Sequence, residues 1–244
     1  MHTQHKELLK IVHKQYEKLK TSLEHKGGGF NKNKPYLFVL GCVMDRQIKA
    51  DKAWQIPKDI EKYFKVNNFE QLQQVLPAEI KKYFIEKKPH RFNDKMADCF
   101  NEAVKKVHIQ YKNDASLIWK GVQSAATVIY RFLEFKGVGL KIATMAVNLL
   151  DQENLFSENF DRSAIDISPD RHVQRVMTRL GLVDESPSVS QIIFKAKEIY
   201  PPFPGLLDLP FYDVGKKYCH AREPQCSSCP FYLHCDYGKN VKIV

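Results

Sequence analysis

The sequence has no apolar stretch long enough to cross a lipid bilayer. Its apolar run Tyr36–Met44 is far shorter than the ~20 residues that a membrane-spanning helix needs. The first residues, Met1–Lys6, lack the apolar core of a signal peptide. We therefore expect a soluble intracellular protein of the cytoplasm or nucleoid.

Turn signals of the Asn-Gly kind and internal repeats are also absent, which argues against hairpin-rich sheets and solenoids. Apolar residues instead recur at helical spacing. The first such segment carries Leu8, Val12, Tyr16, Leu19 and Leu23 and ends before Gly27–Gly29, which is predicted to be a flexible joint. The chain therefore predicts an all-α fold.

Three later segments refine this prediction. The run Tyr36–Met44 is either a strand or a buried helix, because periodicity does not decide between them. The segment Ile142–Leu150 is apolar on almost every face and predicts a central buried helix. A helix over Arg171–Leu180 is expected to stop at Gly181, and another to begin at Ser188.

Positive charge exceeds negative charge by ten, and the isoelectric point is about 9.2. Such a balance favours a polyanionic partner, either a nucleic acid or an anionic membrane surface.

Six cysteines need an explanation, because disulfides are rare inside cells. Four of them are spaced C-x6-C-x2-C-x5-C: Cys219, Cys226, Cys229 and Cys235. These four cysteines have three interpretations: structural thiols, a zinc site or an iron–sulfur cluster. Zinc ribbons usually separate two C-x2-C pairs by a longer stretch, whereas four tightly spaced thiolates suit a [4Fe–4S] cluster. Cys42 and Cys99 lie on apolar faces and are predicted to be buried thiols without chemistry.

The residues around these cysteines resemble the iron–sulfur loop of the endonuclease III family. The matching residues are Gly215, Lys217, Tyr218, Ala221, Arg222, Pro224 and Ser228. The resemblance implies a structural [4Fe–4S] cluster ligated by the four cysteines, in a loop whose Arg222 contacts DNA phosphate. An ordinary solvated charge is the alternative for Arg222.

The segment Phe135–Ala143 joins two helices through a Gly-x-Gly turn. Paired glycines expose N–H groups at the start of the second helix, which suits one DNA phosphate, while Val138 would hold the turn in the core. A simple connector is the alternative. The segment is similar to the helix-hairpin-helix motif of the same glycosylase superfamily, with Lys136 where proline is usual. The similarity implies that Lys136, Gly137, Val138 and Gly139 bind DNA.

Lys141 matches the catalytic lysine of those relatives that excise a base and also cut the strand. Its place at the head of a helix buried on all sides would put the amine near the positive helix end and partly out of water. Both effects favour the neutral amine, which is the nucleophile. A surface lysine that binds phosphate is the alternative.

The segment Asp170–Val176 resembles the aspartate-containing helix start of the family, with the pattern D-x-H-V-x-R-V. Asp170 is expected to stabilise positive charge at C1′ or to accept the proton of the attacking amine. A simple helix cap is the alternative. Because the connection over Asp151–Ser168 is longer than usual in the family, Asp161 and Asp166 are rivals for this role.

An enzyme that acts on a stacked base must flip it out and fill the gap. Gln47 resembles the family's glutamine that enters the vacated space. The loop from His90 resembles the one that wedges the opposite strand, with Arg91 or Phe92 as the intercalating side chain. The alternative is that Arg91 and Phe92 are ordinary loop and packing residues.

Together these resemblances imply a two-lobed all-α architecture. A helical barrel with the hairpin would span 31–163, and a discontinuous cluster domain would combine 1–30 with 164–244. The implied protein is a monomeric DNA glycosylase with AP lyase activity, acting on double-stranded DNA that contains a damaged base or an abasic site. A monofunctional glycosylase, a non-catalytic DNA-binding module and a zinc-dependent adaptor are the alternatives.

Overall fold

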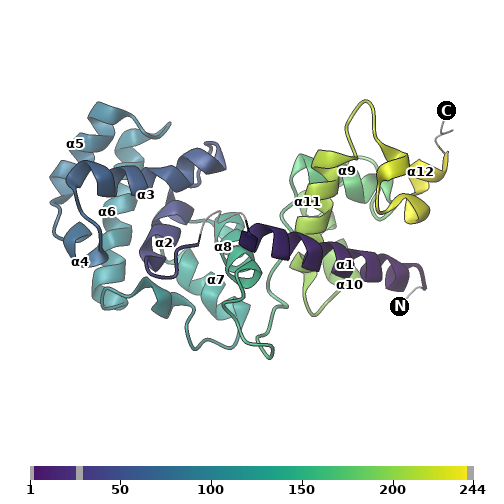
Figure 1. Ribbon diagram of the computed structural model, residues 1–244, viewed down its shortest axis with the longest axis horizontal. Coiled ribbons are helices and arrows are strands. Elements are labelled where there is room, and N and C mark those ends of the chain that lie inside the picture. The colour runs from purple at the N-terminus through teal and green to yellow at the C-terminus, as the bar shows by residue number, and fades with distance from the viewer. Residues whose placement is uncertain (1–2, 26–29, 241–244) are drawn as a thin grey trace. The chain divides into compact units, whose positions relative to one another are not determined.

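The computed structural model describes residues 3–25 and 30–240, and every regular element among them is helical (Figure 1). This confirms the predicted all-α fold class. Within the same residues, every helix is too short or too polar to span a lipid bilayer. The predicted joint at Gly27–Gly29 lies outside the described residues.

The chain divides into two compact units. One comprises Gly27–Phe160, and the other combines Met1–Lys26 with Asp161–Val244. Their assignment as a barrel domain and a cluster domain stays a prediction.

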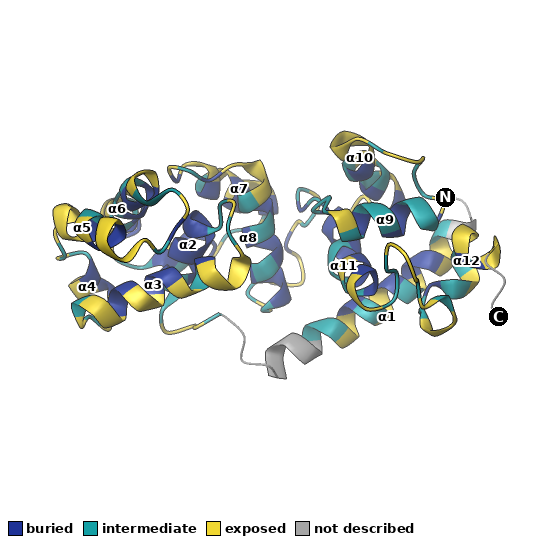
Figure 2. Ribbon diagram, turned by 90° about the horizontal axis from the view of Figure 1, so that it is seen from above, coloured by how far each residue is buried: buried dark blue, intermediate teal, exposed yellow. Residues whose placement is uncertain are grey.

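The unit Gly27–Phe160 is built around one central helix. Its helices are α2 (Pro35–Met44), α3 (Ala50–Phe64), α4 (Phe69–Leu72), α5 (Pro77–Lys87), α6 (Asn93–Gln110), the short 3-10 turn η1 (Ala115–Ile118), α7 (Ala125–Leu133) and α8 (Leu140–Gln152). Helix α2 contacts α3, α6 and α8 and is buried over most of its length (Figure 2). The run Tyr36–Met44 is therefore a buried helix, and the strand interpretation is wrong.

Two features of α2 explain why this apolar run is a helix. Pro35 stands in its first turn, where a missing N–H costs no hydrogen bond. Gly41 lies against the ring of Trp54 from α3, and a Cβ at this position would come within 2.3 Å of that ring. The glycine thus lets α3 approach α2 closely.

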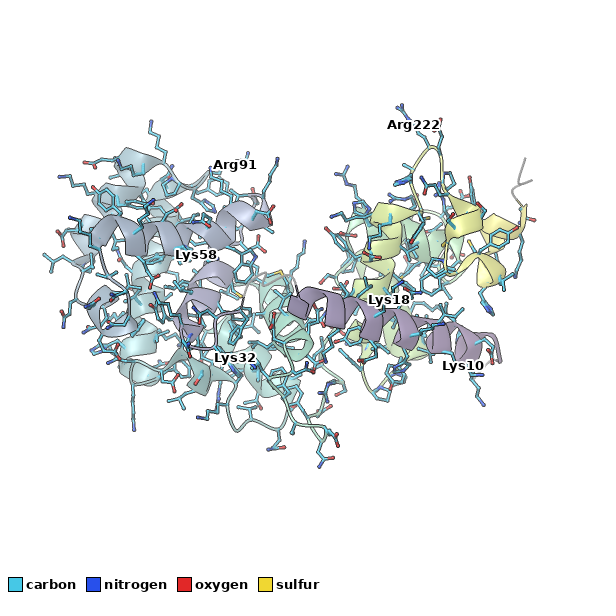
Figure 3. The ribbon with its side chains drawn as sticks, in the orientation of Figure 1. Lys10, Lys18, Lys32, Lys58, Arg91 and Arg222 are labelled. Carbon is cyan, nitrogen blue, oxygen red and sulfur yellow. The ribbon has the colours of Figure 1, made fainter. Side chains whose placement is uncertain are left out.

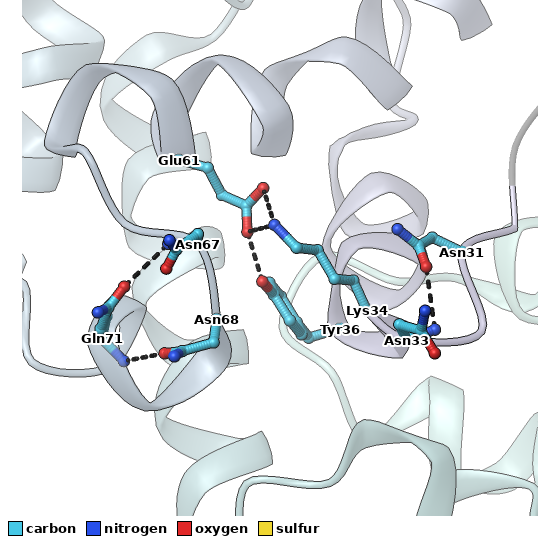
Figure 4. Close-up of polar contacts among 8 residues, drawn as sticks. All are labelled: Asn31, Asn33, Lys34, Tyr36, Glu61, Asn67, Asn68 and Gln71. Carbon is cyan, nitrogen blue, oxygen red and sulfur yellow. Dashed lines mark hydrogen bonds and ion pairs between the residues drawn. The ribbon is translucent and has the colours of Figure 1, made fainter.

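The start of α2 is fixed to α3 by a partly buried ion pair (Figure 4). Lys34 Nζ lies 3.0 Å from both carboxylate oxygens of Glu61, and the Tyr36 hydroxyl donates a hydrogen bond to the same carboxylate. Burial and the neighbouring carboxylate raise the pKa of Tyr36. Because Glu61 is only 9% exposed, losing Lys34 would leave its buried carboxylate without a neutralising charge.

The second unit combines α1 with the C-terminal helices. Its elements are α1 (Thr3–His25), α9 (Arg171–Arg179), α10 (Val189–Ile199), η2 (Pro204–Leu207), α11 (Asp208–Lys217), η3 (Cys226–Ser228), η4 (Tyr232–His234) and α12 (Asp236–Asn240). Helix α11 contacts both α9 and α1. The apolar stripe of α1 faces this core, since Leu8, Val12 and Tyr16 are buried.

Local signals set the ends of two helices in this unit as predicted. Ser188 caps α10, and its hydroxyl accepts a hydrogen bond from the backbone N–H of Gln191. The backbone N–H of Ser188 in turn donates to Oε1 of Gln191. Helix α9 ends just before Gly181, whose φ of 74° is left-handed.

Candidate functional site

The hairpin between α7 and α8 combines a buried anchor with an uncapped helix start. Val138 is 9% exposed and holds the turn in the core, as predicted. Gly137 has a φ of 89°, and a Cβ there would lie 2.9 Å from the sulfur of Cys99. Gly139 precedes α8 and supplies no side-chain cap, so the first N–H groups of the helix remain available to an anion.

This hairpin forms one wall of a cavity of about 700 Å³. The opposite wall is the loop after α2. The lining residues are Asp45, Arg46, Gln47, Ile48, Gly137, Val138, Gly139, Lys141, Ile142 and Met145. The structure thus places Gln47, the hairpin glycines and Lys141 at one cavity, although they are distant in the sequence.

The predicted environment of Lys141 is wrong. Helix α8 is not buried on all sides, because Lys141, Ile142 and Met145 face the cavity. Leu140 is 60% exposed and Lys141 is also exposed, whereas the first buried residue of the helix is Ala143. The first turn of α8 projects beyond the core, so its lysine is hydrated. Its position at the positive end of α8 agrees with the sequence prediction.

Gln47 is exposed at the cavity and has a left-handed backbone with φ of 55°. This conformation costs a non-glycine residue on the order of 1–3 kcal/mol.

Arg91 and Phe92 lie outside this cavity but are connected to its wall. Arg91 is exposed (Figure 3), and its guanidinium lies 5.3 Å from the ring centroid of Phe92. The buried imidazole of His90 accepts the Phe92 N–H at Nδ1, at 3.0 Å, and lies 3.2 Å from Met44 O through Nε2. Since Nδ1 accepts, Nε2 carries the proton and donates it to Met44. His90 therefore joins the Arg91–Phe92 loop to the end of α2.

Asp45 is a cavity residue that the sequence prediction missed. It ends α2 as the C-cap residue and is half-buried. Burial raises the pKa of its carboxyl, and the positive charge of Lys141 partly opposes this rise. An acidic residue directly after an apolar helix was the signal that could have identified it.

In the other unit, Asp170 caps the N-terminus of α9. Its Oδ1 accepts the N–H groups of His172 and Val173, both at 2.8 Å. Of its rivals, Asp161 accepts the N–H of Ser163 at 2.9 Å, and Asp166 forms an ion pair with Lys197 at 3.0 Å. The cap is thus observed, and a catalytic role for Asp170 stays a prediction.

The four clustered cysteines border one small apolar pocket. Cys219, Cys226, Cys229 and Cys235 line it together with Arg179, Tyr218, Pro224, Tyr232, Tyr237 and Gly238. Burial raises the pKa of Cys229 to about 11, and the three other thiols contribute to the rise. Among residues 3–25 and 30–240, no three His, Cys, Asp or Glu side chains are grouped to hold a metal ion. The four cysteines thus share one apolar pocket without being grouped as metal ligands, and the cysteine-ligated cluster stays a prediction.

Two arginines of α9 hold the cysteine loop in place. Arg175 donates to the carbonyls of Cys219 and Gly215, at 2.6 and 2.8 Å. Arg179 donates to His220 O at 2.7 Å and to the sulfur of Cys219 at 3.3 Å. Arg222 is exposed in this loop and extends away from the helices of its unit (Figure 3).

Cys42 and Cys99 are buried, as predicted. Burial raises the pKa of both thiols. Both therefore favour the neutral, unreactive form.

The structure was compared with known proteins. It is similar to a trapped covalent intermediate of endonuclease III with DNA, an estranged-adenine complex, with a TM-score of 0.59 and 17% identity over 98% of each chain. A non-covalent endonuclease III–DNA complex gives a TM-score of 0.57 and 18% identity, again over 98% of each chain. A thermostable thymine-DNA glycosylase gives 0.60 and 16%, with the same coverage.

No protein-family model and no curated protein matches the sequence. At 16–18% identity the likeness to solved structures concerns the fold. The endonuclease III-like fold predicted from the sequence resemblance is confirmed.

Proposed function

We propose that this chain is a DNA glycosylase with AP lyase activity, which acts in base excision repair on double-stranded DNA containing a damaged base or an abasic site. The cavity shared by Gln47, the hairpin and Lys141 carries the proposal. Of the proteins with this fold, endonuclease III forms a covalent intermediate with DNA. A lysine amine is a group that can form such a bond to a sugar.

Three features of the cavity support DNA binding. The uncapped start of α8 offers N–H groups and a positive helix end to a phosphate. Lys136 is exposed on the turn and adds a positive charge beside it. Gln47 projects from the facing wall, where its side chain would occupy the gap left by a flipped base.

Lys141 is the proposed nucleophile. Its nitrogen lone pair forms a bond to C1′, and the electrons of the glycosidic bond leave with the base, which takes up a proton. Opening of the sugar ring gives a Schiff base between Nζ and C1′. Loss of a C2′ proton then expels the 3′ phosphate and breaks the strand.

Asp170 is the proposed carboxylate that stabilises positive charge at C1′. Its Oδ1 is used by the helix cap, whereas Oδ2 makes no hydrogen bond to a described residue. One oxygen therefore remains for a partner outside the protein. Asp161 and Asp166 are engaged within their own unit, which favours Asp170.

A [4Fe–4S] cluster is proposed for the pocket of Cys219, Cys226, Cys229 and Cys235. It would supply no reaction step and would instead cross-link the loop that presents Arg222 to DNA. Arg179 and Arg175 hold the same loop through its carbonyls, so the loop is positioned from α9 as well.

Trapping with borohydride tests the proposed lyase chemistry. Incubation with an abasic duplex and borohydride should give a covalent protein–DNA adduct, because reduction makes the Schiff base permanent. Lys141→Ala should lose both the adduct and the strand break. Lys136→Ala is the matched control: it removes a positive charge from the turn and should weaken DNA binding but leave trapping intact.

The outcomes separate the candidate functions. Normal base release without an adduct would assign the protein to the monofunctional glycosylases. DNA binding with neither base release nor an adduct would indicate a non-catalytic binding module. An adduct that survives in Lys141→Ala and vanishes in Lys136→Ala would reassign the nucleophile.

A further inference from the structure

Two opposite charges face the same cavity from the ends of two contacting helices. Asp45 ends α2, Lys141 lies in the first turn of α8, and both line the cavity of about 700 Å³. Helices α2 and α8 contact each other, so the core fixes both charged positions. The positive charge of Lys141 opposes the rise in the pKa of the Asp45 carboxyl, so Lys141 favours the carboxylate form of Asp45.

Each charge occupies the helix end that carries its own sign. The C-terminal end of α2 is negative and holds the carboxylate of Asp45, while the N-terminal end of α8 is positive and holds the ammonium of Lys141. Neither ion is stabilised by its own helix.

The Asp45 carboxylate has no competing partner in the described residues, where it makes neither a hydrogen bond nor an ion pair. The nearest cation in sequence, Arg46, places its guanidinium beside Gly137 of the hairpin. Half-burial makes the carboxyl a stronger proton acceptor than an ordinary surface aspartate, because burial raises its pKa.

Because Lys141 is exposed, its amine needs a nearby group that accepts a proton. An exposed lysine is mostly an ammonium ion at neutral pH, and an ammonium has no lone pair with which to attack C1′. Dehydration does not solve this problem here, because the side chain is exposed. A proton acceptor in the same cavity would solve it.

We infer that Asp45 accepts the proton that the Lys141 ammonium must lose before it attacks C1′. This inference rests on the proposed glycosylase and lyase function. The N–H bond breaks, its electrons remain on Nζ as the attacking lone pair, and the proton binds Asp45. The proton is then returned to the departing base or, on an abasic site, to the oxygen that leaves C1′ as water, so no further reactant is consumed.

The test is the pH profile of adduct formation by the full-length chain. Single-turnover trapping on an abasic duplex is measured between about pH 6 and pH 9 for wild type, Asp45→Asn and Asp45→Glu. The exposed Asp51→Asn in the first turn of α3 is the matched control, because it removes the same charge outside the cavity. DNA affinity and the melting temperature of each variant are measured in parallel.

Asp45→Asn should slow trapping at neutral pH by about a hundredfold or more, as expected for the loss of a general base. Its rate should rise roughly tenfold per pH unit, because only the small fraction of neutral amine then reacts. Wild type should level off at lower pH, Asp45→Glu should partly restore that profile, and Asp51→Asn should match wild type.

A folded Asp45→Asn with the rate and pH profile of wild type would overturn the role of Asp45 and leave the proposed function standing. A lower rate with an unchanged profile would also overturn it, since a purely structural residue gives that pattern. If wild type forms no adduct, the lyase function fails and the inference fails with it.

Discussion

Phe92 donates its backbone N–H to Nδ1 of His90 at 3.0 Å. The other ring nitrogen bonds to the last carbonyl of α2, so one buried imidazole, 2% exposed, holds two loops that are distant in the sequence. Burial lowers the pKa of His90 below its usual value of 6.5, and the charges of Lys52 and Arg46 act in the same direction. The bonds to the backbone carbonyls of Met44 and Arg46 oppose this lowering.

A pH-dependent stability follows from this lowered pKa. The folded state favours the neutral ring, so below about pH 6.5 the unfolded chain binds more protons. The contribution of neutral His90 to the free energy of unfolding is complete above about pH 6.5. It is lost as the pH falls towards the pKa of His90 in the folded protein. Thermal unfolding measured between about pH 8 and pH 5 should show this loss. His90→Gln, which cannot titrate, should show a smaller change, and an equal change in both proteins would contradict the assignment.

The two hairpin glycines should respond differently to alanine. Gly137→Ala forces a Cβ onto a φ of 89° and against Cys99, so we expect a loss of about 1–3 kcal/mol of stability. Gly139 has an extended backbone, and a Cβ there would meet no atom within 4 Å. Gly139→Ala should therefore keep the stability of wild type, as measured by denaturant unfolding.

If a phosphate approaches Gly139, the Gly139→Ala variant should bind duplex DNA about tenfold more weakly, as expected for one displaced contact. Unchanged affinity would mean that no phosphate binds there.

Protein purified without oxygen should contain about four iron atoms per chain, as a cysteine-ligated cubane requires. Cys226→Ser should lose iron and lower the melting temperature, because the loop then loses a cross-link. Ser227→Ala, an exposed neighbour, is the control and should retain both. Metal analysis and visible absorption measure the outcome, and stoichiometric zinc without iron would refute the cluster.

Asp170→Asn should separate capping from catalysis. An asparagine oxygen can still accept the N–H groups of His172 and Val173, so the helix cap and the stability should persist. Base excision should slow by at least about a hundredfold, because the negative charge is lost. Asp166→Asn, which breaks the ion pair with Lys197, and Asp161→Asn are the comparisons. A loss of excision in either of them, with normal excision in Asp170→Asn, would relocate the carboxylate.

Local sequence patterns were enough to predict the all-α fold class, several helices and the features that depend on neighbours in the chain. Apolar periodicity and caps such as Ser188 act within a few residues, and so did the signals that identified the hairpin and the cysteine loop. The run Tyr36–Met44 stayed ambiguous, because a fully apolar segment has no exposed face to set its period.

Which side chains lie at the same cavity, and which are exposed, became clear from the packing of the helices. The apolar composition of Ile142–Leu150 predicted burial for all of α8, yet the hydration of Lys141 depends on how far the neighbouring helices extend along it. Asp45 and Lys141, like His90 and Met44, lie far apart in the chain and come together only because α2 is packed at the centre of its unit. Such pairs leave no mark in the local pattern, because their proximity arises from packing between helices rather than from the spacing of residues within one.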